Sequence, residues 1–157
     1  MSLSRRIEEY IKKLLESSSS IEVQRSELAG SFKCVPSQIN YVLSTRFTPT
    51  HGYLVESRRG GGGFLRIVKL SWGKSESTQI EEIYHNLGIE IDQWKAEVIL
   101  CRLKDEELIT AREHLLLKAI INRDTLQIDL PERDLIRARI IHSILATLSR
   151  NDLEEEN

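Results

Sequence analysis

The sequence predicts a mainly α-helical fold with a small β-hairpin: an N-terminal winged helix-turn-helix followed by a C-terminal helical bundle. Three observations predict it. Two short amphipathic patterns meet at a tight turn, two strand-like runs are joined by four consecutive glycines, and capped helical patterns fill the rest. We expect a winged domain over residues 1–72, a linker over 73–77, a helical domain over 78–150 and an acidic, disordered tail over 151–157.

The winged domain should begin with a helix, because apolar residues recur there at the spacing of one helix face. A compact helix pair should follow, with Cys34 and Val35 in its turn. Pro36 suits the first turn of the second helix, because a proline has no N–H to lose there. The inward stripes of these three helices are Ile7, Tyr10, Ile11, Leu14 and Leu15; then Leu28, Ala29 and Phe32; then Ile39, Val42 and Leu43. Between the first two helices, residues 21–23 indicate a short extended connection.

The hairpin is predicted from two runs, 53–57 and 64–70, that are rich in β-branched and aromatic residues. Gly60–Gly63 join them, directly after Arg58 and Arg59. A tight hairpin needs about two such residues, so four exceed what the turn requires. Each glycine in a strand costs about 0.5–1 kcal/mol relative to alanine. We therefore expect this wing to open locally before the rest of the chain unfolds.

The second half shows helix starts at regular intervals. Thr110 and Glu113 match a capping box, as do Thr78 and Glu81, and Asp92 can cap another helix. A last helix should begin at Pro131, and its apolar stripe is wide for a helix with water on one side. A subunit interface would use all of that stripe, and a monomeric bundle is the alternative. The residues that we assign to the interface are Ile136, Ile140, Ile144 and Leu148.

Charge is divided unequally along the 157 residues, which are 40% hydrophobic and 29% charged. Up to residue 72 there are 11 Lys and Arg against 6 Asp and Glu, a net charge of +5, whereas the remainder has a net charge of −7. The basic half alone has the sign expected of a surface that approaches phosphates. The N-terminus does not match a signal peptide. Cys34 and Cys101 suit a reduced, cytoplasmic setting as small buried residues.

The outer face of the second helix of the pair is a candidate DNA-reading surface. Its side chains form hydrogen bonds and include almost no acid: Gln38, Asn40, Tyr41, Ser44, Thr45 and Arg46. The major groove admits one helix, where Gln or Asn can bond adenine in two places and Arg can do the same to guanine. The alternative is an ordinary solvated face on a winged-helix module that binds protein. Arg58 and Arg59 at the hairpin tip could enter a narrow minor groove, and the alternative there is a flexible turn.

Other chemistry finds little support in the sequence. Gly73, Lys74 and Ser75 match the end of a Walker motif, but Val68 stands where its first glycine is required. The four histidines lack metal-ligand spacing, and no nucleophile is placed beside a base. We therefore expect no enzyme, no metal and no cofactor. A ligand-sensing regulator would need a polar pocket in the second domain, and nothing in the sequence identifies one.

Three segments together resemble the CtsR family of bacterial heat-shock repressors: CVPSQINYVLSTRF (Cys34 to Phe47), GYLVESRRGGGGFLRI (Gly52 to Ile67) and LPERDLIRARI (Leu130 to Ile140). The similarity runs over nearly the whole chain in matching order. It implies a homodimeric winged-helix repressor of class III stress genes, including Clp components, with a C-terminal helical dimerisation domain and a direct-repeat double-stranded operator.

The resemblance also implies residue roles. The helix-turn-helix would enter the major groove with Arg25, Ser37, Gln38, Asn40, Tyr41, Thr45 and Arg46, and the wing would enter the minor groove. Arg59 matches the family's wing arginine, and Gly60–Gly63 match its heat-sensing loop. The family is further regulated by a protein arginine kinase and degraded by Clp proteolysis. Arg59 and Arg25 would be the phosphorylation sites.

Overall fold

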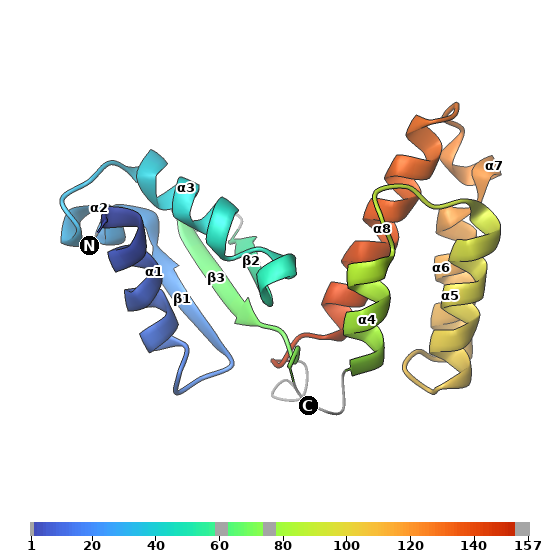
Figure 1. Cartoon of the computed structure of the whole chain (residues 1–157), viewed down its shortest axis with the longest axis horizontal. Helices are drawn as coiled ribbons and strands as arrows, with labels where there is room; N and C mark the ends of the chain where they lie inside the picture. The colour runs from blue at the N-terminus through green and yellow to red at the C-terminus, as the bar shows by residue number, and fades with distance from the viewer. Residues whose placement is uncertain (1, 59–62, 74–77, 153–157) are drawn as a thin grey trace. The chain divides into compact units, whose positions relative to one another are not determined.

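The computed structural model describes residues 2–58, 63–73 and 78–152 (Figure 1). The chain divides into two compact units. One unit is helical and spans Thr78–Leu148; the other contains the residues before it together with those from Ser149 onward. The expected winged and helical regions therefore each form a unit, but the chain returns to the first unit at its C-terminal end.

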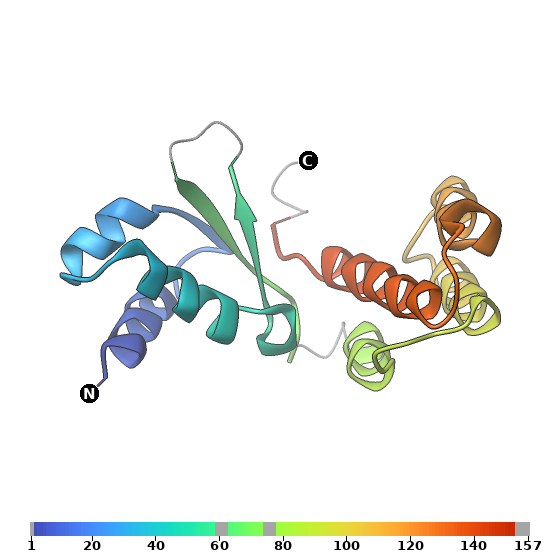
Figure 2. The same ribbon diagram turned by 90° about the horizontal axis from the view of Figure 1, so that it is seen from above.

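The first unit has helices on one face of a small sheet (Figures 1 and 2). Its elements, in chain order, are α1 (Leu3–Leu14), β1 (Ser20–Gln24), α2 (Arg25–Ser31), α3 (Pro36–Arg46), η1 (Pro49–His51), β2 (Tyr53–Ser57) and β3 (Phe64–Lys69). The sheet is antiparallel in the order β1-β3-β2. The predicted hairpin is confirmed, and the expected extended connection over residues 21–23 is the middle of a third strand, β1, which pairs with β3.

Burial explains how these helices and strands hold together. In β3 successive side chains point to opposite faces, so Leu65 and Ile67 enter the core at 1% and 0% exposure while Arg66 lies on the outer face. The core that they join also contains Ile7, Ile11, Leu15, Leu28, Ala29, Ile39, Val42, Leu43 and Phe47. The predicted inward stripes thus meet in one core. Tyr10 and Leu14 are exceptions, because both are exposed at the edge of α1.

The helical unit contains α4 (Thr78–Asn86), α5 (Gln93–Asp105), α6 (Ala111–Ile121), α7 (Arg123–Leu126) and α8 (Glu132–Leu148). Two predicted caps are confirmed. The Asp92 carboxylate accepts from the Lys95 N–H at 2.8 Å, and Thr110 and Glu113 form a reciprocal capping box. Among the described residues, no helix is both long and apolar enough to cross a membrane.

A buried arginine, which the sequence analysis did not identify, fixes α8 within this unit. Arg137 is 1% exposed, and its Nε donates to the Ile121 carbonyl at 2.9 Å while Nη1 donates to the Ile91 carbonyl at 3.1 Å. Asp134, one turn earlier, pairs with the same guanidinium. A buried charge is tolerated when it is paired and hydrogen-bonded. The arginine therefore joins α8 to the end of α6 and to the loop before α5.

The boundary after α8 differs from the sequence prediction. We define the C-terminal strap as Ser149–Asp152, the described residues that follow α8. The predicted helical domain extended to residue 150 and the predicted disordered tail began at 151, but the strap lies within the first unit. The Asn151 N–H donates to the Lys69 carbonyl at 3.0 Å, and Asp152 is 1% exposed. Polar, acidic residues of this kind are usually solvated; here they are buried because they have charged partners.

Candidate nucleic-acid interface

The geometry of the α2–α3 turn decides which face of α3 is exposed. Lys33 has a positive φ of 52°, and the Cys34 N–H donates to the Ala29 carbonyl at 2.9 Å, which closes α2 with a left-handed residue. The turn brings the apolar stripe of α3 onto the core. Ile39 and Val42 are 0% and 1% exposed, so the opposite side of the helix must face solvent.

Every residue predicted on the outer face of α3 is exposed. These residues are Ser37, Gln38, Asn40, Tyr41, Ser44, Thr45 and Arg46. Tyr41 is the most informative, because 58% of a large aromatic side chain is left in water. The structure thus brings the predicted set together on one helix face, which suits a flat polar partner.

The hydrogen bonds of α3 separate two amides that the sequence treated alike. The side-chain amide oxygen of Gln38 accepts from the Val35 N–H at 3.1 Å and so caps the helix. Two-point recognition of adenine needs both the oxygen and the nitrogen of an amide, and the cap occupies this oxygen. Asn40 lies two residues beyond Gln38 and is exposed. Asn40 is therefore the better candidate for reading a base, and Gln38 the better candidate for positioning the helix.

Two of the predicted DNA-facing arginines, Arg46 and Arg58, are paired within the chain. Arg46 Nη1 lies 3.4 Å from a carboxylate oxygen of Glu8, and Arg58 Nη1 lies 3.4 Å from one of Glu22. Arg58 and Glu22 are 64% and 52% exposed. Exposed ion pairs contribute only about 0–1 kcal/mol. Arg58 can therefore exchange a carboxylate for a phosphate at little cost, whereas Glu8, the partner of Arg46, is only 16% exposed.

The wing lies between the last residue of β2 and the first residue of β3. The Arg58 N–H donates to the Phe64 carbonyl at 3.0 Å, and Gly63 has a φ of +87°. Arg59 and Gly60–Gly62 lie outside the described residues. Arg25, the first residue of α2, donates its N–H to the Gly63 carbonyl at 3.2 Å. This bond places Arg25 beside the wing rather than on the outer face of α3.

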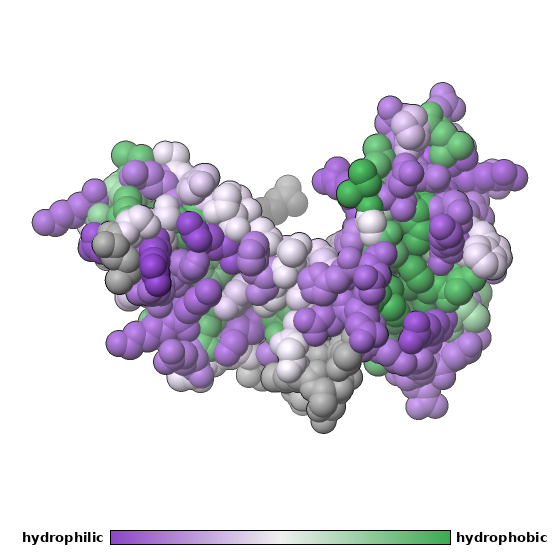
Figure 3. Space-filling view, in the orientation of Figure 1, coloured by the Kyte–Doolittle hydropathy of each residue, from purple (hydrophilic) through white to green (hydrophobic). Residues whose placement is uncertain are grey.

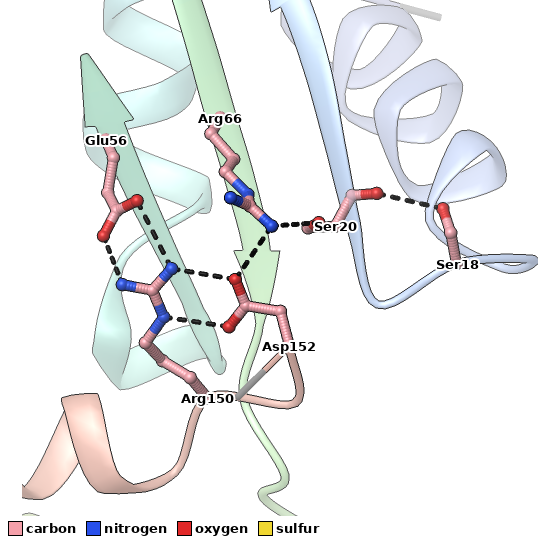
Figure 4. Close-up of polar contacts among 6 residues, drawn as sticks. All are labelled: Ser18, Ser20, Glu56, Arg66, Arg150 and Asp152. Atoms are coloured by element: carbon pink, nitrogen blue, oxygen red, sulfur yellow. Dashed lines mark hydrogen bonds and ion pairs between the residues drawn. The ribbon is translucent and has the colours of Figure 1, made fainter. Parts of the chain in front are cut away.

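A charged network holds the outer face of the sheet below the wing (Figure 4). The Arg150 guanidinium pairs with Glu56 on β2 and with Asp152. Arg150 Nε donates to one Asp152 oxygen at 2.9 Å, and Nη2 donates to the other at 2.8 Å. Asp152 also lies 3.1 Å from Arg66 on β3. The hydrogen bond from Arg150 and its positive charge, with that of Arg66, hold the pKa of Asp152 below its ordinary value, although burial opposes them. Arg150 in turn has a raised pKa, chiefly through its hydrogen bond to Asp152.

The helical unit carries two apolar grooves. One, of about 500 Å³, lies between α6 and α8 and is lined by Leu116, Ile120, Ile140, Ile144 and Leu148 among others. Three of the four residues predicted for the dimer interface line it; Ile136 is half-buried but does not. Leu116 and Ile120 are 57% and 46% exposed. The sequence analysis did not assign these two residues to the interface. The signal that would have found them is their spacing of one helical turn, on a face next to the one that carries the buried Ile121.

The second groove lies between α4 and α5, where Figure 3 shows apolar surface. Trp94 and Val98, at 71% and 48% exposure, are among its lining residues.

The two cysteines do not match their expected burial equally well. Both are free thiols, and Cys34 is half-buried in the α2–α3 turn. Cys101 is exposed, which corrects the expectation that both would be buried. Its Sγ lies 3.7 Å from the Asp105 carboxylate one turn further along α5. Within residues 2–58, 63–73 and 78–152, no cluster of His, Cys, Asp and Glu could hold a metal ion.

Two family models match the chain in succession. One is described as the CtsR N-terminal HTH domain and covers residues 2–71; the other is described as the CtsR C-terminal dimerization domain and covers residues 75–146. The chain belongs to the CtsR family. The resemblance seen in the sequence is thereby confirmed, and the mainly helical fold with a helix-turn-helix unit is confirmed with it.

Relatives of this CtsR chain are similar over most of their length. The transcriptional regulator CtsR of Geobacillus stearothermophilus is 46% identical over 144 residues, which cover 90% of this chain and 94% of the relative. That of Bacillus subtilis (strain 168) is 42% identical over 144 residues, covering 90% and 93%. A solved structure described as CtsR in complex with a 26-base-pair DNA duplex is 45% identical, covers 94% of this chain and 99% of its own, and has a TM-score of 0.49. These relatives are named as regulators and not as enzymes, as expected for this chain.

The lowered pKa of Asp152 predicts how the network below the wing depends on pH. The network should stabilise the fold above the ordinary carboxyl value of 3.8, and its contribution should fall as the pH drops through the lowered pKa. Replacing Asp152 by Asn should lower the free energy of unfolding by about 1–3 kcal/mol near neutral pH, because a buried charged partner is lost. The same deficit should persist above the ordinary carboxyl value of 3.8 and shrink as the pH falls through the lowered pKa of Asp152, where the carboxylate of the parent chain becomes protonated.

Chemical denaturation followed by Trp72 fluorescence, in a Trp94→Phe background, reports on the first unit alone. Asp129→Asn, an exposed carboxylate of the other unit, serves as the matched control. A deficit that does not change with pH would contradict the assigned role of the Asp152 charge, since Glu56, Arg66 and Arg150 are the other charges that face it.

Proposed function

We propose that this CtsR-family chain is a dimeric, sequence-specific DNA-binding repressor of heat-shock and Clp genes, acting on double-stranded operator. The exposed face of α3 beside a basic wing carries the proposal. Relatives named as transcriptional regulators support it, as does the helix-turn-helix description of the matching family model. The dependence of affinity on salt distinguishes this proposal from the alternative, a winged-helix module that binds protein. Each phosphate contact contributes about −0.9 to the log–log slope of affinity against salt, so a flat slope would favour the alternative.

In this proposal α3 occupies the major groove and the wing occupies the adjacent minor groove. Asn40 and Arg46 supply the directional contacts, and Ser37, Tyr41, Ser44 and Thr45 line the backbone. The Thr45 hydroxyl donates to the Tyr41 carbonyl at 2.6 Å, so its proton is already used within the helix. Arg46 leaves Glu8 for its directional contact, Arg58 leaves Glu22 for the contact of the wing with DNA, and Arg25 stabilises the start of the wing.

Asn40→Ala should weaken operator binding by about 1–3 kcal/mol, the cost of a lost two-point base contact. Binding to an unrelated duplex should change little, because phosphate contacts are kept. Titrations with both duplexes at fixed salt measure the ratio of operator affinity to affinity for the unrelated duplex. Asn86→Ala, at an exposed asparagine of α4, is the matched control. Equal losses on the two duplexes would show that Asn40 does not read a base.

We also propose that the wing carries the heat response. Gly63 cannot be used to stiffen it, because alanine at a φ of +87° would be strained. Gly61→Ala should instead reduce the conformational freedom of the loop and raise the temperature at which operator is released. Binding measured from about 25 to 50 °C tests this, with Gly30→Ala, an open helical position, as the control. An unchanged release temperature in Gly60→Ala, Gly61→Ala and Gly62→Ala would exclude the glycine loop as the sensor.

Phosphorylation by a protein arginine kinase, followed by Clp proteolysis, is the further regulation that we propose. A phosphoryl group adds about two negative charges, which would repel DNA at Arg59. Arg25 is a poorer target, because its side chain is half-buried. Arg59→Glu should mimic the modified chain and lose operator, whereas Arg59→Lys keeps the charge and should lose less. Normal binding by the Arg59→Glu chain would remove this site from the proposal.

The α6–α8 groove is the surface that we propose for the dimer. Its apolar lining is continuous with the stripe of α8, and an exposed apolar patch of this kind marks an interaction site. Leu116→Glu should convert the dimer into a monomer, because a carboxylate would be buried in the interface. Val98→Glu, at similar exposure in the α4–α5 groove, should leave the dimer intact. Sedimentation at micromolar concentrations measures both, and the opposite pair of outcomes would move the interface to the α4–α5 groove.

A further inference from the structure

The C-terminal strap pairs with the end of β3 through its backbone. The Ser71 N–H donates to the Ser149 carbonyl at 2.7 Å, the Asn151 N–H donates to the Lys69 carbonyl at 3.0 Å, and Leu70 and Arg150 form an antiparallel bridge. Ser149 and Asp152 are 2% and 1% exposed. The strap is therefore packed and hydrogen-bonded as part of the first unit.

The side chains of the strap reach the two strands that carry the wing. Arg150 pairs with Glu56 on β2, and Asp152 pairs with Arg66 on β3. Glu56 and Arg66 are themselves partners in the β2–β3 register, one pair before Ser57 and Leu65, which end the ladder below the wing. Because Arg150 and Asp152 also pair with each other (Figure 4), a continuous chain of charges joins β2 to β3 at this point.

This network acts on the face of the sheet that the helices leave uncovered. The inner face is fixed by core residues such as Leu65 and Ile67, whereas Arg66 lies on the outer face. Removal of the strap charges would leave Glu56 and Arg66 joined by their cross-strand pairing alone, and such pairs contribute little. Both faces together determine the twist and the direction in which the hairpin projects.

We propose that Arg150 and Asp152 are positioning residues for the wing. They hold β2 and β3 in the arrangement that lets Arg58 and Arg59 contact DNA, without contacting DNA themselves. The inference rests on the proposed wing contact and assigns a role to a segment beyond the helical unit. It predicts that a change in the strap affects operator affinity through the wing and through no other contact.

A double-mutant cycle on the full-length chain tests this role. Arg150→Gln should weaken operator binding about tenfold, the size expected of coupling between neighbouring sites. In a chain that already carries Arg58→Ala and Arg59→Ala, the same change should weaken binding by less than about twofold. Arg150→Lys should restore part of the loss, and Arg139→Gln, an exposed arginine of α8, should have no effect. Amide exchange should accelerate in β2 and β3 and stay unchanged in α3.

Each other outcome overturns the positioning role. Equal losses in both backgrounds would mean that the strap acts through general stability. No loss in either background would mean that the wing does not depend on the strap. If Arg58→Ala and Arg59→Ala together leave binding unchanged, the wing contact of the proposed function fails as well, which distinguishes that failure from failure of the strap alone.

Discussion

The pairing of β3 with a strand on each side is the constraint on which the rest of the first unit depends. β3 hydrogen-bonds to β1 at one edge and to β2 at the other. Its inward residues Leu65 and Ile67 anchor the core against which α3 packs, and its outward Arg66 joins the strap network. This one strand therefore determines which face of α3 is exposed, how the wing strands are paired and where the strap binds.

Electrostatics in this unit follow two regimes that differ in burial. Arg58–Glu22 is an exposed pair on the candidate DNA surface, and water already screens it, whereas Glu8 of the Arg46 pair is only 16% exposed. The pair of Arg150 with Asp152 lies where the carboxylate is almost fully buried. Breaking a pair that is buried costs far more than breaking one in water. The chain thus combines arginines that can exchange partners with arginines that keep theirs.

The sequence predicted most of the fold where periodicity and capping chemistry act locally. The stripe of α3, the Thr110 capping box and the glycine-joined strands are local patterns, and each has its predicted place. β1 escaped prediction because Ser20–Gln24 becomes a strand only by pairing with a segment 40 or more residues later. The strap escaped because its burial depends on Glu56 and Arg66, distant partners that pair with Arg150 and Asp152. The Gln38 cap is local, but a glutamine that caps a helix and a glutamine that reads a base look identical in a sequence.

The strap also determines when the first unit can be completed. A nascent chain emerges from the ribosome N-terminus first and folds by domains, yet Ser149–Asp152 belong to the unit that begins at the opposite end of the chain. Until the helices between them have been synthesised, the outer side of the sheet stays bare. A partly translated chain therefore possesses α3 before it possesses the strap, and the first unit is complete only once residues 149–152 are available to pair with β3.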